Sequence, residues 1–131
     1  MKNIPNSEHS KRITIANGAS VSEPIDNRRV GLRGFGVCMD GAWTAARIGV
    51  QVTDGNPEDT SAVWRDLRDD EGALVAISGI ATSADPALYS CPGEVWQVGA
   101  WPWFRLTSVN TASEAAVNQG AARTLIVSMV Y

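Results

Sequence analysis

Short apolar stretches with a two-residue alternation, separated by turn-forming residues, run along most of the chain and limit its fold more than any other feature. The clearest stretch is Ala46–Thr53, in which Ile48, Val50 and Val52 alternate with residues of the opposite face. Clusters of Gly, Pro, Asn and Asp separate such stretches, and no long amphipathic helical pattern lies between them. We therefore predict an all-β fold, an antiparallel β-sandwich of a jelly-roll-like kind.

Other stretches of the same kind are expected to form the remaining strands. They are Ile13–Ile15, Val21–Ile25, Val30–Val37, Val63–Arg68, Ala73–Ser78, Trp101–Val109 and Arg123–Tyr131. The polar turn Asp69–Gly72 is expected to join two of them as a hairpin. Two short helical pieces are also predicted: one turn at Asp85–Tyr89, where a capping aspartate precedes proline, and an alanine-rich helix at Thr111–Gly120.

The chain reads as one domain preceded by an arm. It has 131 residues, of which 44% are hydrophobic, which is enough for one stable core. Met1–Arg12 is polar and without periodicity, and is predicted to be an extended N-terminal arm that orders on a partner surface. Ile13–Tyr131 is predicted to be the β-sandwich domain. The arm residues expected to contact a partner are Ile4, Pro5, His9, Lys11 and Arg12.

Charge and hydropathy exclude several classes of protein. The formal net charge is -3 and 19% of residues are charged, which argues against a nucleic-acid binder because such proteins show a clustered basic excess. No apolar run is long enough to cross a bilayer, and the N-terminus lacks the apolar stretch of a secretory signal. We therefore expect synthesis in a reducing cytoplasm. Cys38 and Cys91 are interpreted as two buried thiols, with a disulfide between them as the alternative.

No motif in the sequence indicates catalysis or metal binding. The single histidine, His9, lies in the arm, where nothing would hold it as a catalytic base. Asp54–Asp59 places several oxygen ligands in one loop, but its spacing differs from a calcium-binding loop. Asp69, Asp70 and Glu71 are interpreted as the solvated tip of a hairpin. We therefore predict no catalytic residue, no metal site and no cofactor, and a protein that is not an enzyme.

The tryptophans and arginines supply the remaining candidate contacts. In Trp101–Arg105, alternation is expected to send Trp101, Trp103 and Arg105 to one face and Phe104 to the core, so that Trp103 faces outward. Three roles remain open for this segment: packing in the core, a subunit interface, or stacking on sugar rings. Arg28, Arg29 and Arg33 form a small basic patch. It either contacts phosphate or an acidic partner surface, or guards a strand edge.

Several segments together resemble a small family of virion structural proteins from tailed bacteriophages and gene-transfer particles. The segments that carry the resemblance are Ile13–Asp26, Gly41–Val52, Trp64–Leu67, Asp70–Gly72, Phe104–Ser108 and Val117–Leu125. The resemblance covers the chain from about Ile13 to Val130 and is to a pattern of strands and turns. It implies a β-sandwich component of a phage particle.

In that setting the expected function is that of a capsid cement or decoration protein. It would bind the outer surface of the head and stabilise contacts between subunits of the major capsid protein. Copies of the chain would also contact one another, with a trimer favoured over a pentamer. A head-spike base, neck or tail component is the near alternative. A carbohydrate-binding adsorption module is the alternative from a different class.

Overall fold

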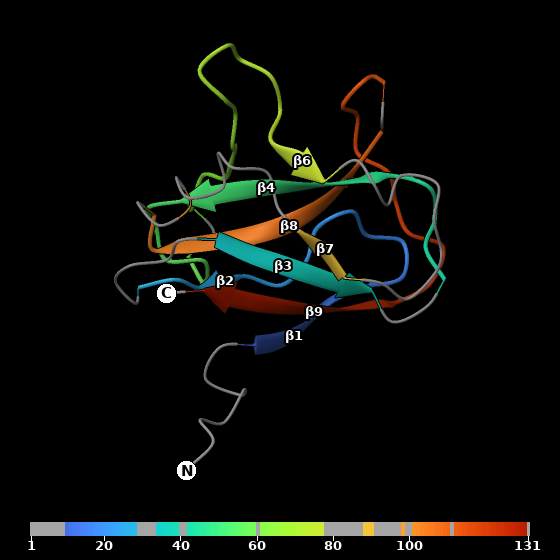
Figure 1. Ribbon diagram of the computed structural model, residues 1–131. Coiled ribbons are helices and arrows are strands. Elements are labelled where there is room, and N and C mark those ends of the chain that lie inside the picture. Colours follow the sequence, from blue (N-terminus) through green and yellow to red (C-terminus); the bar gives the residue numbers. More distant parts are fainter. Residues whose placement is uncertain are drawn as a thin grey trace.

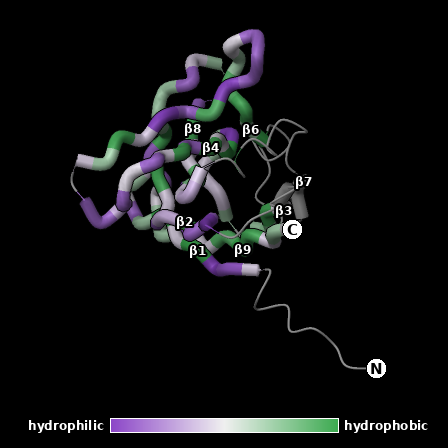
Figure 2. The backbone as a smooth tube through the Cα atoms, turned by 90° about the vertical axis from the view of Figure 1, so that its left-hand side faces the viewer, coloured by the Kyte–Doolittle hydropathy of each residue, from purple (hydrophilic) through white to green (hydrophobic). Residues whose placement is uncertain are grey.

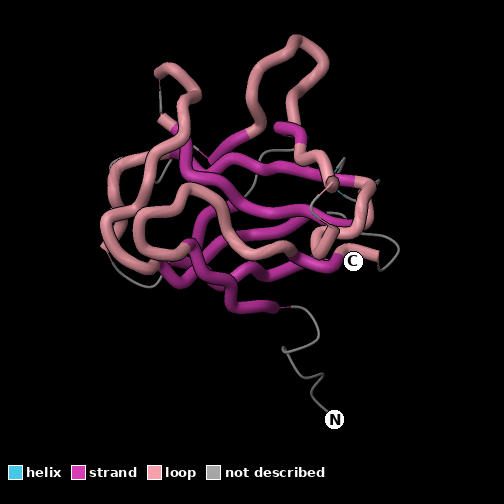
Figure 3. The backbone as a smooth tube through the Cα atoms, turned by 180° about the vertical axis from the view of Figure 1, so that it is seen from behind, coloured by secondary structure: helices cyan, strands magenta, loops and turns pink. Residues whose placement is uncertain are grey.

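The structure, a computed structural model, consists of strands joined by loops and turns (Figure 1). It describes residues 10–28, 34–39, 42–59, 61–77, 88–90, 98, 101–110 and 112–130, and of Gly34, Phe35, Leu88–Ser90 and Val130 it describes the backbone only. Figure 3 shows the same chain coloured by secondary structure. Within the described residues there is no α-helix, and the prediction of an all-β fold is confirmed.

The strands form two antiparallel sheets. In spatial order, the first sheet contains β1 (Ser10–Ile15), β9 (Arg123–Val130), β3 (Gly34–Met39) and β7 (Leu88–Ser90). The second contains β2 (Ile25–Asp26), β8 (Trp103–Val109), β4 (Arg47–Thr53) and β5 (Arg65–Asp66), with β6 (Ala76–Ile77) also paired to β4. Strands close in sequence often belong to different sheets, as β1 and β2 or β3 and β4 do.

One apolar core fills the space between the sheets, as expected of a β-sandwich. Ile13 and Val127 enter it from the first sheet, and Val50, Phe104 and Leu106 enter it from the second. Each is at most 3% exposed, and each lies on the inward side of an alternating strand. In Figure 2 the loops that project from the sandwich are largely hydrophilic, while the hydrophobic positions follow the strands. The sequence alternates along these strands because every second side chain is buried in the core.

The segment Ser20–Glu23 connects the two sheets along one side of the sandwich. Ser22 forms an antiparallel bridge with Ile15 of β1, and Val21 forms one with Thr107 of β8. The Ser22 backbone N–H donates to Leu106 O at 2.8 Å, and the Leu106 N–H donates to Ser22 Oγ at 3.0 Å. In place of the predicted strand Val21–Ile25, the structure has isolated bridges at Val21 and Ser22, followed by the short strand β2.

The outer edge of β4 is paired in two separate pieces. β5 and β6 both run antiparallel to β4, at Gln51–Val52 and Ile48–Gly49. Between them Leu67–Val75 leaves the sheet as a hairpin, visible in Figure 1 as the loop that rises between β4 and β6. The Asp69 carboxylate accepts hydrogen bonds from two backbone N–H groups of the turn, both at 2.9 Å. The hairpin predicted at Asp69–Gly72 is confirmed at its tip, whereas its flanking strands pair with β4.

Two helix predictions are wrong where the structure describes them. Residues 112–120 form turns and a bridge between Val109 and Ala116. The chain folds back onto β8 there: the Asn110 N–H donates to Ala115 O at 2.7 Å and the Val117 N–H donates to Ser108 O at 2.8 Å, and the φ of 63° at Glu114 is not helical. Of the predicted helical turn at Asp85–Tyr89, the described residues Leu88 and Tyr89 belong to β7. There, pairing with β3 overrides local propensity.

Candidate binding face

The outer face of the second sheet carries two groups of interacting polar and aromatic side chains. Phe104 and Leu106 point from β8 into the core, so Trp103 and Arg105 emerge on the opposite face, each half-buried. This confirms the orientation expected for Trp103. We call the surface formed by Asp26, Arg28, Gln51, Trp64, Asp66, Trp103 and Arg105 the Arg–Trp face.

At one end of the Arg–Trp face, Arg28 lies over the Trp103 ring, 5.0 Å from its centroid. Asp26 holds Arg28 in this position: Nε is 3.0 Å from Oδ1, Nη2 is 2.7 Å from Oδ2, and the Arg28 N–H donates to Oδ1 at 3.0 Å. Asp26 is also the cross-strand partner of Trp103. A ring, a cation and an anion thus form one preorganised unit on β2 and β8.

The hydrogen bonds from Arg28 lower the pKa of Asp26 from 3.8 to about 2, with Arg28 and Lys11 adding a favourable charge interaction. Because the folded-state pKa is depressed, the stabilisation is complete above about pH 4 and is lost as the pH falls toward 2. The side chains are 65% and 42% exposed, so the contribution stays below about 1 kcal/mol.

We therefore expect an NMR titration of the Asp26 carboxyl carbon to give a pKa of about 2. Arg28→Gln should return that pKa toward 3.8, because it removes the dominant hydrogen bonds. A wild-type value near 3.8 would show that this pair does not form in solution.

The Arg105 guanidinium forms the centre of the Arg–Trp face. It lies 4.3 Å from the centroid of the Trp64 ring, and its Nε donates to Gln51 Oε1 at 2.8 Å. Gln51 in turn contacts Asp66, because its Nε2 donates to Asp66 Oδ1 at 3.0 Å. Burial lowers the pKa of Arg105, and the charge of Asp66 opposes that shift. These groups come from three neighbouring strands or their ends, so the sheet fixes their spacing.

Arg68 extends this network to a second projecting loop. Its Nη2 lies 3.7 Å from Asp66 Oδ2, and its Nη1 lies 3.3 Å from Glu114 Oε1. Glu114 has a φ of 63°, which is unusual for a residue with a side chain. The hairpin and the turn after β8 are thereby tied together by exposed ion pairs.

The structure brings some of the predicted contact residues together and separates others. Arg28 and Trp103 meet in the Arg–Trp face, and Lys11 lies near enough to Asp26 to affect its pKa. Lys11 and Arg12 belong to β1 and are exposed, so strand pairing begins before the boundary predicted between arm and domain. Five predicted residues lie outside the described residues: Ile4, Pro5, His9, Arg29 and Arg33.

Trp101 does not share the face of Trp103, contrary to prediction. It precedes β8 and packs against the core. Its N–H donates to Val98 O at 3.0 Å, and its carbonyl accepts from Asn27 Nδ2 at 3.1 Å. These bonds hold Trp101 outside the strand, so the alternation begins only at Trp103.

Two buried amides that sequence reasoning missed hold the loops in place. Asn27, 2% exposed, donates from Nδ2 to Val98 O at 2.9 Å as well as to Trp101 O, and so positions Arg28 next to β8. Gln119, 1% exposed, bonds to both backbone groups of Thr44 and to Ser108 Oγ. Asn and Gln usually occur in turns and on the surface. No local sequence pattern distinguishes Asn27 and Gln119, which are buried, from exposed residues of the same types.

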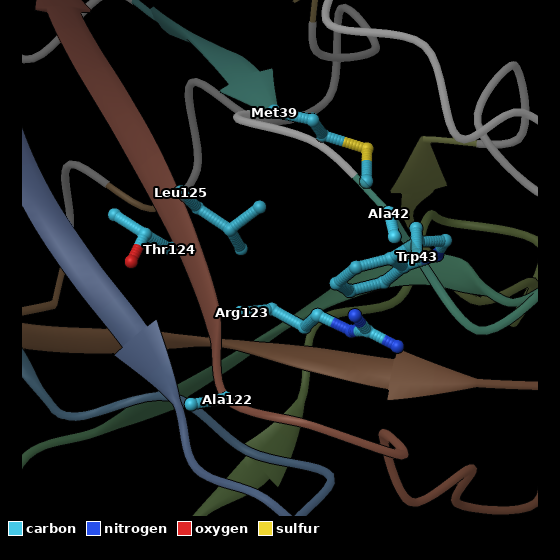
Figure 4. A pocket seen from close by; sticks show the side chains of 7 residues that line it. All are labelled: Met39, Ala42, Trp43, Ala122, Arg123, Thr124 and Leu125. Atoms are coloured by element: carbon cyan, nitrogen blue, oxygen red, sulfur yellow. The ribbon is translucent and has the colours of Figure 1, made fainter.

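The described residues line two surface pockets of similar size, among others. One, of about 230 Å³, lies between Trp43 and the start of β9, and Figure 4 shows the side chains that line it. Its cation, Arg123, already donates to Gln119 Oε1 and Thr44 Oγ1, each at 3.2 Å. The other, of about 260 Å³, lies between the end of β4, the loop that follows it and Trp101.

Cys38 carries a free thiol in β3, but it is half-buried where the interpretation expected a buried thiol, and Cys91 lies outside the described residues. The described ranges contain no cluster of three or more His, Cys, Asp or Glu side chains placed to bind a metal ion. Among the same residues, no helix has the length and apolar character needed to span a membrane.

Comparisons of the chain with known proteins do not indicate a family or a function. No family model, no curated protein and no solved structure matches it.

Proposed function

We propose that this chain is a non-enzymatic structural component of a bacteriophage virion, and specifically a capsid cement or decoration protein. The observation that carries the proposal is the Arg–Trp face, a rigid contact surface built from the residue types that dominate protein–protein hot spots. Arg28 and Arg105 each lie over a tryptophan ring and are each held by a polar neighbour. The resemblance to phage virion proteins supplies the setting.

The order of the strands supports a jelly-roll fold for the domain. When β5 and β6 are counted as one interrupted strand and the strands are renumbered accordingly, the sheets have the orders 1-8-3-6 and 2-7-4-5. This pairing of first with last strand, and of second with next-to-last, is what two nested Greek keys produce. Jelly rolls are common in viral capsids, where small rigid domains must pack in many copies.

The Arg–Trp face would act mainly by being fixed before binding. The entropy of ordering long side chains opposes association, and the ion pair of Asp26 with Arg28 and the bond of Gln51 with Arg105 have already restricted these groups. Neighbouring copies, in a trimer by preference, and the major capsid protein are the proposed partners. Residues before Ser10 are proposed to form an arm that reaches an adjacent subunit.

The test is the number and position of copies on purified particles, measured by quantitative mass spectrometry and cryo-electron microscopy. A cement protein should be present in hundreds of copies over the outer surface of the head. Tens of copies confined to vertices would instead indicate a spike base, and a handful at one vertex a neck or tail component. Absence from particles would refute the whole proposal.

A matched pair of variants tests the Arg–Trp face itself. Trp103→Ala should reduce occupancy on heads at least tenfold, because it removes a ring central to the proposed contact. Thr14→Ala, an exposed change on the other sheet, should leave occupancy unchanged. Occupancy that survives Trp103→Ala would place the contact elsewhere on the molecule.

A further inference from the structure

The pocket beside Trp101 combines an aromatic ring with exposed polar side chains. Asp54 and Arg65 both line it, and their side chains make no hydrogen bond or ion pair with any described residue. Asn56 lines it too, with its Oδ1 occupied by the Glu58 N–H and its amide NH₂ unused within the described residues. An acceptor, a cation and an amide donor therefore face one small cavity next to a tryptophan.

The walls of this pocket are held by their own hydrogen bonds. The Gly55 N–H donates to Thr53 Oγ1 at 3.1 Å, and the Asp59 N–H donates to Asn56 O at 2.9 Å. The Ser61 N–H donates to Asp59 Oδ1 at 2.9 Å, which lowers the pKa of that carboxyl. Asp54 and Arg65 take no part in this bonding, so they can be replaced without removing what shapes the loop.

The pocket is also lined by an exposed apolar residue. Val63 is 56% exposed and is the one large hydrophobic side chain in the described residues exposed to that degree. It lines the same pocket as Trp101. Apolar surface is thus placed beside exposed polar groups, a combination that suits a ligand with both kinds of surface.

We propose that this pocket binds one pyranose ring of a carbohydrate. A sugar ring has an apolar C–H face that stacks on an aromatic side chain, and hydroxyls at its rim that both donate and accept hydrogen bonds. Asp54 would accept from hydroxyls, and Arg65 and the Asn56 amide would donate to them. The volume of about 260 Å³ is just below the roughly 300–1,000 Å³ typical of sites for drug-sized ligands, which fits a single ring.

This site is separate from the Arg–Trp face, and the inference does not rest on the proposed virion function. Trp101 packs against the core and Trp103 lies on the outer face of the sheet. The two sites can therefore be tested by different substitutions. If the chain binds sugar but is absent from particles, the inference stands and the proposed function is refuted. If it is present on particles but binds no sugar, the proposed function stands and the inference is refuted.

The experiment is saturation-transfer-difference NMR with the full chain and a panel of free sugars. The panel contains glucose, galactose, mannose, rhamnose, N-acetylglucosamine and glucuronate, each at millimolar concentration. We expect transfer to at least one of them, and affinity at least tenfold weaker in Asp54→Ala and in Arg65→Ala. If only glucuronate shows transfer, and Arg65→Ala abolishes it, the bound sugar is an acidic one.

Glu58→Gln is the matched control, because Glu58 is exposed in the same loop and does not line the pocket. It should bind as the wild type does. Trp101→Phe, which keeps a ring against the core, should weaken binding with little loss of stability. No transfer from any sugar would overturn the inference, and so would transfer that persists unchanged in both Asp54→Ala and Arg65→Ala.

Discussion

Replacing Phe104 by alanine is expected to lower the free energy of unfolding by about 4 kcal/mol. Phe104 is fully buried on the central strand β8, where it pairs with Val52 of β4 and Ile25 of β2. Its ring contributes to the single core that joins the two sheets, so its removal leaves a cavity that the paired strands cannot close. Urea denaturation followed by circular dichroism measures the loss.

Trp103→Ala, one residue earlier, provides the control for this prediction. It deletes a larger side chain, but from the outer face of the same strand, and should cost less than about 1.5 kcal/mol. The ratio of the two effects reports which face of β8 is buried. Equal losses would mean that Trp103 is part of the folded core and would weaken its assignment to the Arg–Trp face.

Gln119→Ala is expected to cost about 3 kcal/mol, the second largest effect. The Gln119 amide accepts from the Thr44 N–H at 2.8 Å and donates to Thr44 O at 3.1 Å and to Ser108 Oγ at 2.8 Å. Alanine would leave these buried or half-buried groups without a partner, and each such group costs about 1–3 kcal/mol. The Arg123 Nε would also lose its acceptor.

Thermal unfolding of Gln119→Ala beside Asn118→Ala tests this prediction. Asn118 is exposed, and its replacement should change stability by less than about 0.5 kcal/mol. At this chain length, a loss of 3 kcal/mol corresponds to a decrease in Tm of roughly 10 °C. A Gln119→Ala protein as stable as Asn118→Ala would show that water replaces the amide at little cost.

Strand positions could be predicted from the sequence because burial and alternation are local. Ala46–Thr53 differs from β4 by one residue, and Phe104 and Leu106 were placed correctly in the core. The helix expected at Thr111–Gly120 was wrong because this segment pairs back with the end of β8, through backbone hydrogen bonds that alanine propensity does not reveal. Local propensity predicts well only where no tertiary pairing competes with it.

The candidate site could be predicted only in part. The outward position of Trp103 follows from alternation, but its contact with Arg28 depends on the pairing of β2 with β8, which is distant in sequence. Trp64 and Gln51 were missed as partners of Arg105 for the same reason. The separation of Trp101 from Trp103 depends on hydrogen bonds to Asn27 and Val98, and no pattern in the sequence predicts those.

The two-piece pairing along β4 has a consequence for how molecules of this chain could associate. A long bare strand at the border of a sheet invites another chain to add to it and start a fibre. Here β5 and β6 each offer two residues, and the projecting Leu67–Val75 hairpin stands between them. Open-ended growth through that border is therefore hindered, because an incoming strand would find no continuous run of backbone groups to pair with.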